Sequence, residues 1–256
     1  MTIVRLTDPI EHYRHIAACS DIHALAGHGF GVSAIDFTSS NILAGLDLGP
    51  HDILLDIGCG DGSLLYAASS QVSKCMGVIP TVEEQQRLLI AYPQISFLVG
   101  LAQKLPLESE SASKIVCNSV LLVFGTEDKV IPALEEIARV ARPGARIWIG
   151  EVPAANEFEH FNIYSGGTLP GLLWHQLRYK GLRPFFGTCK SALRSLIGRD
   201  TLEIVSYSMF YSAPERFIQL IEDCGLKVQK HFKHQRLDTS GKVIESPFRY
   251  NYLVSK

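Results

Sequence analysis

The chain of 256 residues is 46% hydrophobic and 20% charged, and its net charge is −2. This composition is typical of a folded globular protein and excludes a disordered chain, a collagen-like chain and a small disulfide scaffold. The longest nearly apolar stretch, residues 115–124, is too short for a membrane-spanning helix, which takes about 20 residues.

The predicted elements begin with an N-terminal helical segment, residues 1–50. Short apolar runs then predict buried strands at 53–57, 74–79, 95–99, 114–118 and 146–150. Helices are expected at 63–70, 81–92 and 131–141, and Thr81 and Glu84 have the spacing of a capping box. Residues 154–205 interrupt the alternation, before a helix at 214–224 and strands near 227–235 and 249–255. Strands that alternate with helices indicate a parallel sheet that is covered on both faces.

A glycine-rich loop, Asp56-Ile57-Gly58-Cys59-Gly60-Asp61-Gly62, follows the first of these strands. Glycines permit a tight turn and let a ligand approach the backbone closely. In open parallel sheets, ligands bind at the carboxyl ends of the strands. The pattern differs from a dinucleotide fingerprint, because the position of the last glycine is Ser63 and the next strand ends in Ile79 instead of an acid.

This loop resembles motif I of the class I S-adenosylmethionine-dependent methyltransferases. Leu105-Pro106-Leu107 and the segment Glu136–Gly144 are similar to two further motifs of that family. The resemblance covers about residues 50–152 and, more weakly, 212–256. It implies a Rossmann-like, doubly wound α/β fold with a seven-stranded, mostly parallel sheet, a last strand inserted antiparallel, and an α-helical cap insertion.

The resemblance also implies S-adenosylmethionine as cofactor and a site for it. Asp56 and the loop glycines would line its methionine portion, and Asn118 would lie near the transferred methyl group. The positions that match the family's cofactor site are Asp56, Gly58, Cys59, Gly60, Gly62, Ile79, Pro80, Leu101, Ala102 and Asn118. Ile79 and Leu101 stand where the family usually has acids for the ribose and the adenine. Glu83 or Glu84 could reach back to the ribose, and the alternative is that both are solvated.

Three parts of the chain follow from these patterns: the N-terminal segment 1–50, a methyltransferase core of 51–153 and 206–256, and a basic aromatic cap insertion of 154–205. From His160 to Arg199 there are six cations and no acid, whereas the other residues include 18 basic against 26 acidic side chains. Such a cap suits a small anionic substrate, and it also suits contact with an anionic membrane surface. The alternative is an ordinary solvated surface, and nucleic acid is not expected as a partner. The expected substrate contacts are Trp174, Arg178 and Arg183.

We expect methyl transfer to a small anionic acceptor, with a hydroxyl group favoured and a sugar, a nucleotide-linked or a lipid-linked compound as candidates. A hydroxyl acceptor needs a base, and His160, Tyr164 and His175 are the candidates that the cap supplies. The alternative is a catalytically degenerate domain that serves as a binding or assembly protein. The six cysteines form no closely spaced pair and Asp8 and Glu11 argue against a signal peptide, so we expect a cytoplasmic protein without a metal site.

Overall fold

The computed structural model describes residues 2–6, 8–17, 22–26, 32–155, 168–197, 201–205, 208–238 and 240–256. The chain divides into two compact units. We call residues 13–160 and 209–256 the core unit, and residues 1–12 and 161–208 the insertion unit.

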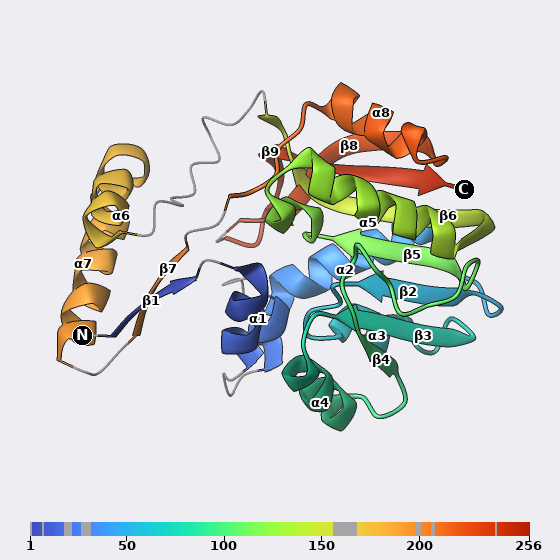
Figure 1. Cartoon of the computed structure of the whole chain (residues 1–256), viewed down its shortest axis with the longest axis horizontal. Coiled ribbons are helices and arrows are strands. Elements are labelled where there is room, and N and C mark those ends of the chain that lie inside the picture. The colour runs from blue at the N-terminus through green and yellow to red at the C-terminus, as the bar shows by residue number, and fades with distance from the viewer. Residues whose placement is uncertain are drawn as a thin grey trace. The chain divides into compact units, whose positions relative to one another are not determined.

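The core unit is built on a seven-stranded sheet with the order β4-β3-β2-β5-β6-β9-β8 (Figure 1). Neighbouring strands from β4 to β6 pair in parallel, and β9 pairs antiparallel with both β6 and β8. The prediction of a seven-stranded, mostly parallel sheet with the last strand inserted antiparallel is therefore confirmed. The strands are β2 (Ile53–Ile57), β3 (Lys74–Ile79), β4 (Ser96–Val99), β5 (Ala112–Asn118), β6 (Ala141–Pro153), β8 (Lys227–Leu237) and β9 (Val243–Ser255).

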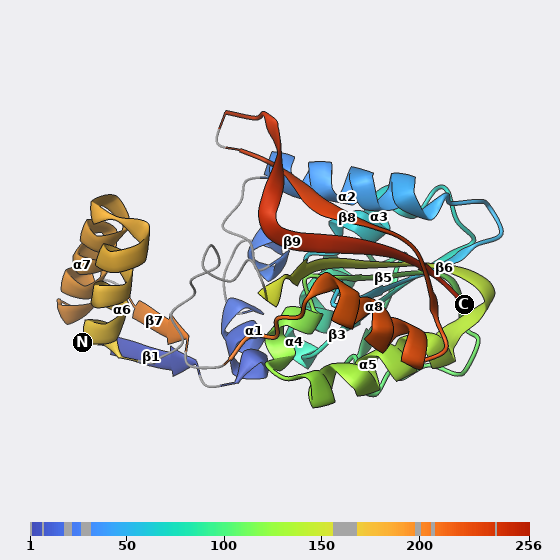
Figure 2. The same cartoon turned by 90° about the horizontal axis from the view of Figure 1, so that it is seen from above.

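Helices cover both faces of this sheet, with α2 and α3 on one face and α5 and α8 on the other (Figure 2). Consecutive residues of one strand therefore enter different cores: Leu54 packs with residues of α2, α3 and α4, and Leu55 with residues of α5 and α8. Burial on both faces explains why the strands are continuous apolar runs. The helices are α1 (Pro9–Ala17), α2 (Val32–Leu46), α3 (Ser63–Ala68), α4 (Val82–Ala91), α5 (Glu127–Val140) and α8 (Pro214–Asp223), with short 3₁₀ turns at Ile22–Ala26 and Leu121–Phe124.

The strand order reverses between β2 and β5. The chain proceeds from β2 through β3 to β4 on one side, and from β5 to β6 on the other. Ligands of open α/β sheets bind outside the carboxyl ends of the strands at such a switch point. The glycine-rich loop that follows β2 and the segment that follows β5 flank this point.

The insertion unit combines a two-stranded parallel sheet with helices. Strand β1 (Thr2–Leu6) pairs with β7 (Thr201–Val205). Helix α6 (Leu169–His175) continues as a π-helical turn (Gln176–Lys180), and Gly181 separates it from α7 (Leu182–Leu196). A small cluster of Ala192, Ile204, Leu169 and Leu172 holds these elements together.

The structure differs from the sequence-based expectation mainly in the insertion unit. Thr2–Leu6 is a strand, although residues 1–50 were expected to be helical. Its partner strand lies almost 200 residues away, and such a pairing leaves no local pattern in the sequence. Residues 1–12 consequently group with 161–208, whereas we expected an insertion of 154–205 alone. The helical character expected of the cap is found in α6 and α7, and a π-helical turn begins at Gln176 between them.

No helix in the described part of the chain is both long enough and apolar enough to cross a lipid bilayer.

Candidate functional site

The loop between β2 and α3 has a backbone that only glycine adopts readily. Gly58, Gly60 and Gly62 have φ angles of 73°, 53° and 77°, all in the left-handed region. A Cβ atom on Gly58 would lie 2.4 Å from Cγ2 of Val120, which follows β5. The loop therefore needs glycine both for its turn and for its close approach to the segment after β5.

Backbone hydrogen bonds fix this loop on the sheet. The amide of Gly58 donates to the carbonyl of Val78 at 2.8 Å, and the amide of Gly62 donates to the carbonyl of Cys59 at 2.9 Å. The Cys59 side chain is buried, and this burial raises the pKa of its thiol well above the ordinary range. Cys59 is thus a neutral packing residue that anchors the loop.

Two buried carboxyl groups flank the loop. Asp56, in β2, is 5% exposed; burial, together with the nearby Asp61, raises its pKa to about 8. Asp61 is 3% exposed, and its Oδ1 accepts hydrogen bonds from the backbone amide and the hydroxyl of Ser63 at 3.1 and 2.7 Å. Its Oδ2 lies 2.7 Å from Nδ1 of His23. The site therefore concentrates carboxyl groups in a place that water scarcely reaches.

Glu84 is a third buried carboxyl group beside the loop. It is 1% exposed, and its burial raises its pKa. The hydroxyl of Thr81, the N-cap of α4, donates to Oε2 of Glu84 at 2.6 Å and accepts from its amide at 3.3 Å, so the predicted capping-box pair forms. The charge of Glu84 also contributes to the raised pKa of Cys59. Glu83, in contrast, is about half exposed and pairs with Arg14 at 3.8 Å.

At the two positions where the family that the sequence resembles usually has acids, this chain has apolar residues, one buried and one exposed. Ile79 ends β3 with 1% exposure and packs in the core beneath α2–α4, whereas Leu101 is 42% exposed. Their neighbours Pro80 and Ala102 are half-buried and buried. Ile79 and Leu101 offer no polar group to a ribose or an adenine, so any polar contacts must come from elsewhere.

A charged cluster secures the segment after β4. Glu136 and Arg139 of α5 pair at 2.6 Å, and Oε2 of Glu136 accepts from the amide of Leu105 at 2.7 Å. Arg139 donates to the carbonyl of Leu107 at 2.8 Å and to that of Leu105 at 3.3 Å. The two segments that resemble family motifs in the sequence, 105–107 and 136–144, thus meet in space and position the loop that begins at Gly100.

Asn118, at the carboxyl end of β5, lies in a chain of polar contacts. Its Oδ1 accepts from the indole nitrogen of Trp148 at 3.3 Å, and its Nδ2 donates to Oε1 of Glu151 at 3.0 Å. Glu151 is 5% exposed, pairs with Arg249 and adopts a φ of 59° where β6 is irregular. Its amide donates to Oδ1 of Asn251 at 3.0 Å. These contacts connect the end of β5 with β9.

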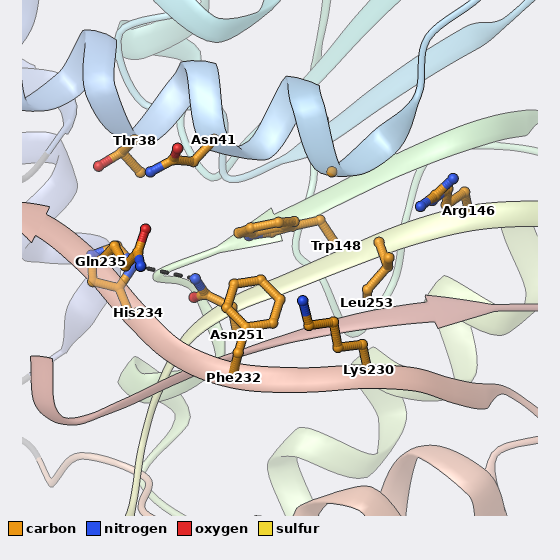
Figure 3. A pocket seen from close by; sticks show the side chains of 11 residues that line it. Thr38, Asn41, Arg146, Trp148, Lys230, Phe232, His234, Gln235, Asn251 and Leu253 are labelled. Carbon is orange, nitrogen blue, oxygen red and sulfur yellow. Dashed lines mark hydrogen bonds between the residues drawn. The ribbon is translucent and has the colours of Figure 1, made fainter. Parts of the chain in front are cut away.

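A cavity of about 320 Å³ lies on the sheet beneath α2 (Figure 3). The indole of Trp148 stands between Thr38 and Asn41 of α2 and Phe232 of β8, and the rings of Trp148 and Phe232 meet edge to face with centroids 5.6 Å apart. Nδ2 of Asn251 lies 3.4 Å from Nδ1 of His234. The Trp148 side chain lines the cavity and also contacts Asn118, so it connects the cavity with the carboxyl end of β5. The lining consists of Thr38, Asn41, Gly45, Arg146, Trp148, Lys230, Phe232, His234, Gln235, Asn251 and Leu253, with no carboxyl group among them.

The substrate residues and the catalytic residue that the structure describes belong to the insertion unit. His175 is 7% exposed, whereas Trp174 is 65% exposed and Arg178 and Arg183 are also exposed. The other two catalytic candidates, His160 and Tyr164, lie outside the described residues. The catalytic and substrate roles of all these residues stay predictions.

Sequence reasoning missed several members of the site. Asp61 was quoted only as part of the loop, although an acid two positions before a helix-opening Ser63 is a turn and cap signal. Glu151 and His23 had no local signal, because their partners are 33 and 38 residues away. Among the described residues, no cluster of three or more His, Cys, Asp or Glu side chains could hold a metal ion.

Comparison with known families gives a match over the central part of the chain. Residues 55–149 match the family model described as a methyltransferase domain. An uncharacterized methyltransferase of Schizosaccharomyces pombe is 32% identical over 95 residues, which are 37% of this chain and 36% of that protein. The chain thus covers about a third of the length of that relative.

Solved structures resemble the chain over almost its whole length. The N-methyltransferase NodS of Bradyrhizobium japonicum, in complex with S-adenosyl-L-homocysteine, has a TM-score of 0.60 at 11% identity and aligns over 96% of this chain and 97% of its own. The [4+2]-cyclase SpnF has a TM-score of 0.61 at 10% identity, over 100% and 98% of the two chains. At such identities the likeness concerns the fold, which is that of the Rossmann-like methyltransferases.

Proposed function

We propose that the chain, whose residues 55–149 match the model of a methyltransferase domain, is an S-adenosylmethionine-dependent methyltransferase. The observation that carries the proposal is the group of three buried carboxyls, Asp56, Asp61 and Glu84, around the glycine-rich loop. S-adenosylmethionine bears a sulfonium and an ammonium group, and opposite charges are favoured where water is excluded. A dinucleotide would instead bring phosphates to the same carboxyl groups. The donor set therefore fits a cationic ligand.

The residues of the loop would hold the cofactor, which supplies an electrophilic methyl group when bound. Gly58, Gly60 and Gly62 leave room for close approach to the backbone, and Asp56 offers a carboxylate to a cationic group. Asn118 is kept in a fixed orientation by Trp148 and Glu151 at the end of the adjacent strand. Positioning of both reactants supplies much of the rate of such a transfer.

Glu84 is our candidate for the ribose contact that Ile79 does not offer. It is buried beside the loop, and the hydroxyl and the backbone of Thr81 both donate hydrogen bonds that favour its charged form. A carboxylate accepts hydrogen bonds from both hydroxyls of a diol, so Glu84 could replace the acid that the resemblance leads us to expect at the end of the second strand. Glu83 faces Arg14 and is a poorer candidate.

Titration calorimetry of the full chain with S-adenosylmethionine tests the assignment of the loop. Gly60→Val places a β-branched residue at a φ of 53° and should abolish binding while the circular dichroism spectrum is retained. Gly144→Val is the matched control, because Gly144 has a φ of 78° with nothing within 4 Å of an added Cβ. Equal affinity in both variants would contradict the assignment.

For the acceptor we propose a small anionic molecule that is methylated on a hydroxyl oxygen. Two features support this choice: the cations of the insertion unit, including Arg178 and Arg183, and the cavity beneath α2 with Arg146 and Lys230 and no carboxyl group in its lining. His160, Tyr164 and His175 remain the candidate bases that the sequence suggests, and His234 is added because it lines that cavity. A cytoplasmic setting is part of the proposal, and the free thiols of the described cysteines support it.

Transfer of a labelled methyl group to sugar phosphates, carboxylic acids and nucleotide-linked sugars would identify the acceptor. Arg178→Gln with Arg183→Gln should raise KM for the acceptor if the insertion unit binds it, and Arg146→Gln with Lys230→Gln should do so if the cavity binds it. Neither pair should alter cofactor affinity. If neutral compounds are methylated as fast as anionic ones, the acceptor proposal is wrong.

A second candidate function is ligand binding without methyl transfer. It is favoured by the apolar side chains at Ile79 and Leu101, where the family has acids. Cofactor binding in calorimetry without labelled product from any acceptor class would support this candidate.

A further inference from the structure

Helix α7 has an unusual distribution of side chains. Its small residues Ala192 and Ser195 are buried, at 7% and 0% exposure, whereas the large apolar residues Phe186 and Leu193 are 63% and 62% exposed. An ordinary surface helix buries its large apolar side chains and exposes polar ones. The inward face of α7 is fixed by packing of Ala192 with Ile204, Leu169 and Leu172, so the large side chains face outward.

The exposed apolar side chains form one continuous stripe. Positions 182, 186, 193 and 197 recur on one side of a helix with 3.6 residues per turn, and Leu196 lies next to them. Half of the large apolar side chains that are exposed in the described residues, seven of fourteen, fall within 174–197. We define the apolar stripe as Leu182, Phe186, Leu193, Leu196 and Ile197, all at least 55% exposed.

Cations border this stripe along one side. Arg183, Lys190 and Arg194 are exposed and share the helix face next to the stripe. The described segment 168–197 contains no Asp or Glu. A wide apolar face beside a row of cations is the arrangement of helices that lie in the interface of an anionic membrane.

The charge distribution decides between the possible occupants of this face. A two-fold contact with a second copy would bring the same surface patch against itself, and cations would then face cations with no carboxylate of this segment to offset them. Lipid phosphates complement the cations, and the acyl boundary takes the apolar side chains. We propose that helix α7 docks the protein on anionic membranes, with the apolar stripe in the lipid interface and Lys190 and Arg194 at the headgroups. This role goes beyond methyl transfer and does not depend on it.

Flotation of the full chain with vesicles tests the proposal without any cofactor. The protein should bind vesicles of phosphatidylcholine with phosphatidylglycerol and bind pure phosphatidylcholine more weakly. Phe186→Ser with Leu193→Ser should lower the partition coefficient by about tenfold or more, because both apolar side chains leave the interface. Lys190→Gln and Arg194→Gln should each lower it by about fivefold on anionic vesicles, and high salt should have the same effect.

The matched control is Leu89→Ser with Ile90→Ser on α4, which removes two exposed apolar side chains from the core unit. This variant should bind vesicles as the unmodified chain does. Binding that both double variants lose equally, or no binding by the unmodified chain, would overturn the proposal. A dimer that Phe186→Ser with Leu193→Ser converts to a monomer, without vesicle binding, would assign the face to a second copy. Protection of α7 from hydrogen exchange on addition of S-adenosylmethionine alone, again without vesicle binding, would assign it to the core unit.

Discussion

Asp56 lowers the stability of the ligand-free protein and favours the binding of a cationic ligand. Its carboxyl is buried with Asp61 nearby, so the folded protein resists its ionisation and the pKa rises to about 8. A cationic ligand removes this penalty because it favours the charged form. The same group that weakens the ligand-free protein therefore provides the attraction for a sulfonium compound.

This exchange predicts opposite effects for Asp56→Asn. The folded protein holds the Asp56 proton between pH 3.8 and about 8 while the unfolded chain loses it, so the free energy of unfolding falls as pH rises through that window. Asp56→Asn should remove this pH dependence, which amounts to up to about 1.4 kcal/mol per pH unit. Compared with the unmodified chain at the same pH, the variant should therefore be favoured more at pH 8 than at pH 5. Urea unfolding at both pH values measures the difference, and calorimetry should show weaker binding of S-adenosylmethionine. A variant that is less stable at pH 8 than the unmodified chain would contradict this account.

Glu84 and Glu83 give a paired prediction for the ribose contact. Glu84→Gln keeps the shape of a buried side chain but removes its charge, and it should weaken cofactor binding by about tenfold or more. Glu83→Gln, on the exposed neighbour, should leave affinity unchanged. Equal affinities for both variants in calorimetry would show that another group contacts the ribose.

Ile79 gives a case in which the structure reverses a sequence-based expectation. Because Ile79 stands where the family usually has an acid, the sequence alone would predict that Ile79→Asp adds a ribose contact and tightens cofactor binding. At 1% exposure and in a packed core, however, an unpaired carboxylate would be costly. We therefore expect Ile79→Asp to destabilise the fold, which makes Glu84 the better position at which to examine the ribose.

At the scale of elements, α5 is coupled to the segment after β4 through Arg139. Arg139→Ala would leave the Glu136 carboxylate without its partner at 2.6 Å and release the carbonyls of Leu105 and Leu107. The expected cost in the free energy of unfolding is about 1.5–3 kcal/mol, and denaturant unfolding measures it. Arg142→Ala is the control, because Arg142 makes one exposed contact, with the carbonyl of Glu110, and should cost less than about 0.5 kcal/mol. Similar costs for both would contradict a specific role for the cluster.

The sequence predicted the elements that have a strong local pattern. Ile53–Ile57 and Lys74–Ile79 were found with their observed bounds, because a buried strand between glycine and polar residues is a clear signal. Several later strands are longer than predicted. The strand Ala141–Pro153, for example, includes Arg142, Pro143 and Gly144, whose pattern in the sequence indicated only the end of a helix. The sequence identified the loop glycines. It did not decide whether Glu84 contacts the ribose or is solvated, because the burial of this residue depends on packing across the sheet.

At the scale of the whole molecule, two units carry two kinds of surface. The core unit holds buried carboxyls around the glycine-rich loop, and the insertion unit holds exposed cations and the apolar stripe. Residues 1–12 group with the insertion unit, in which β1 pairs with β7. In our proposals the core unit binds the cofactor, and the insertion unit supplies candidate acceptor contacts and docks on membranes.

The central claim is that the core unit binds a cationic methyl donor at an acidic glycine-rich loop. Titration calorimetry of the unmodified full chain with S-adenosylmethionine, S-adenosylhomocysteine and NAD tests it most directly. We predict binding of the first two, with the affinity for S-adenosylmethionine increasing from pH 6 to pH 8 as Asp56 gives up its proton more easily. NAD should give no binding heat, because its phosphates meet Asp56 and Asp61. Binding of NAD, or no heat from S-adenosylmethionine at either pH, would contradict the account.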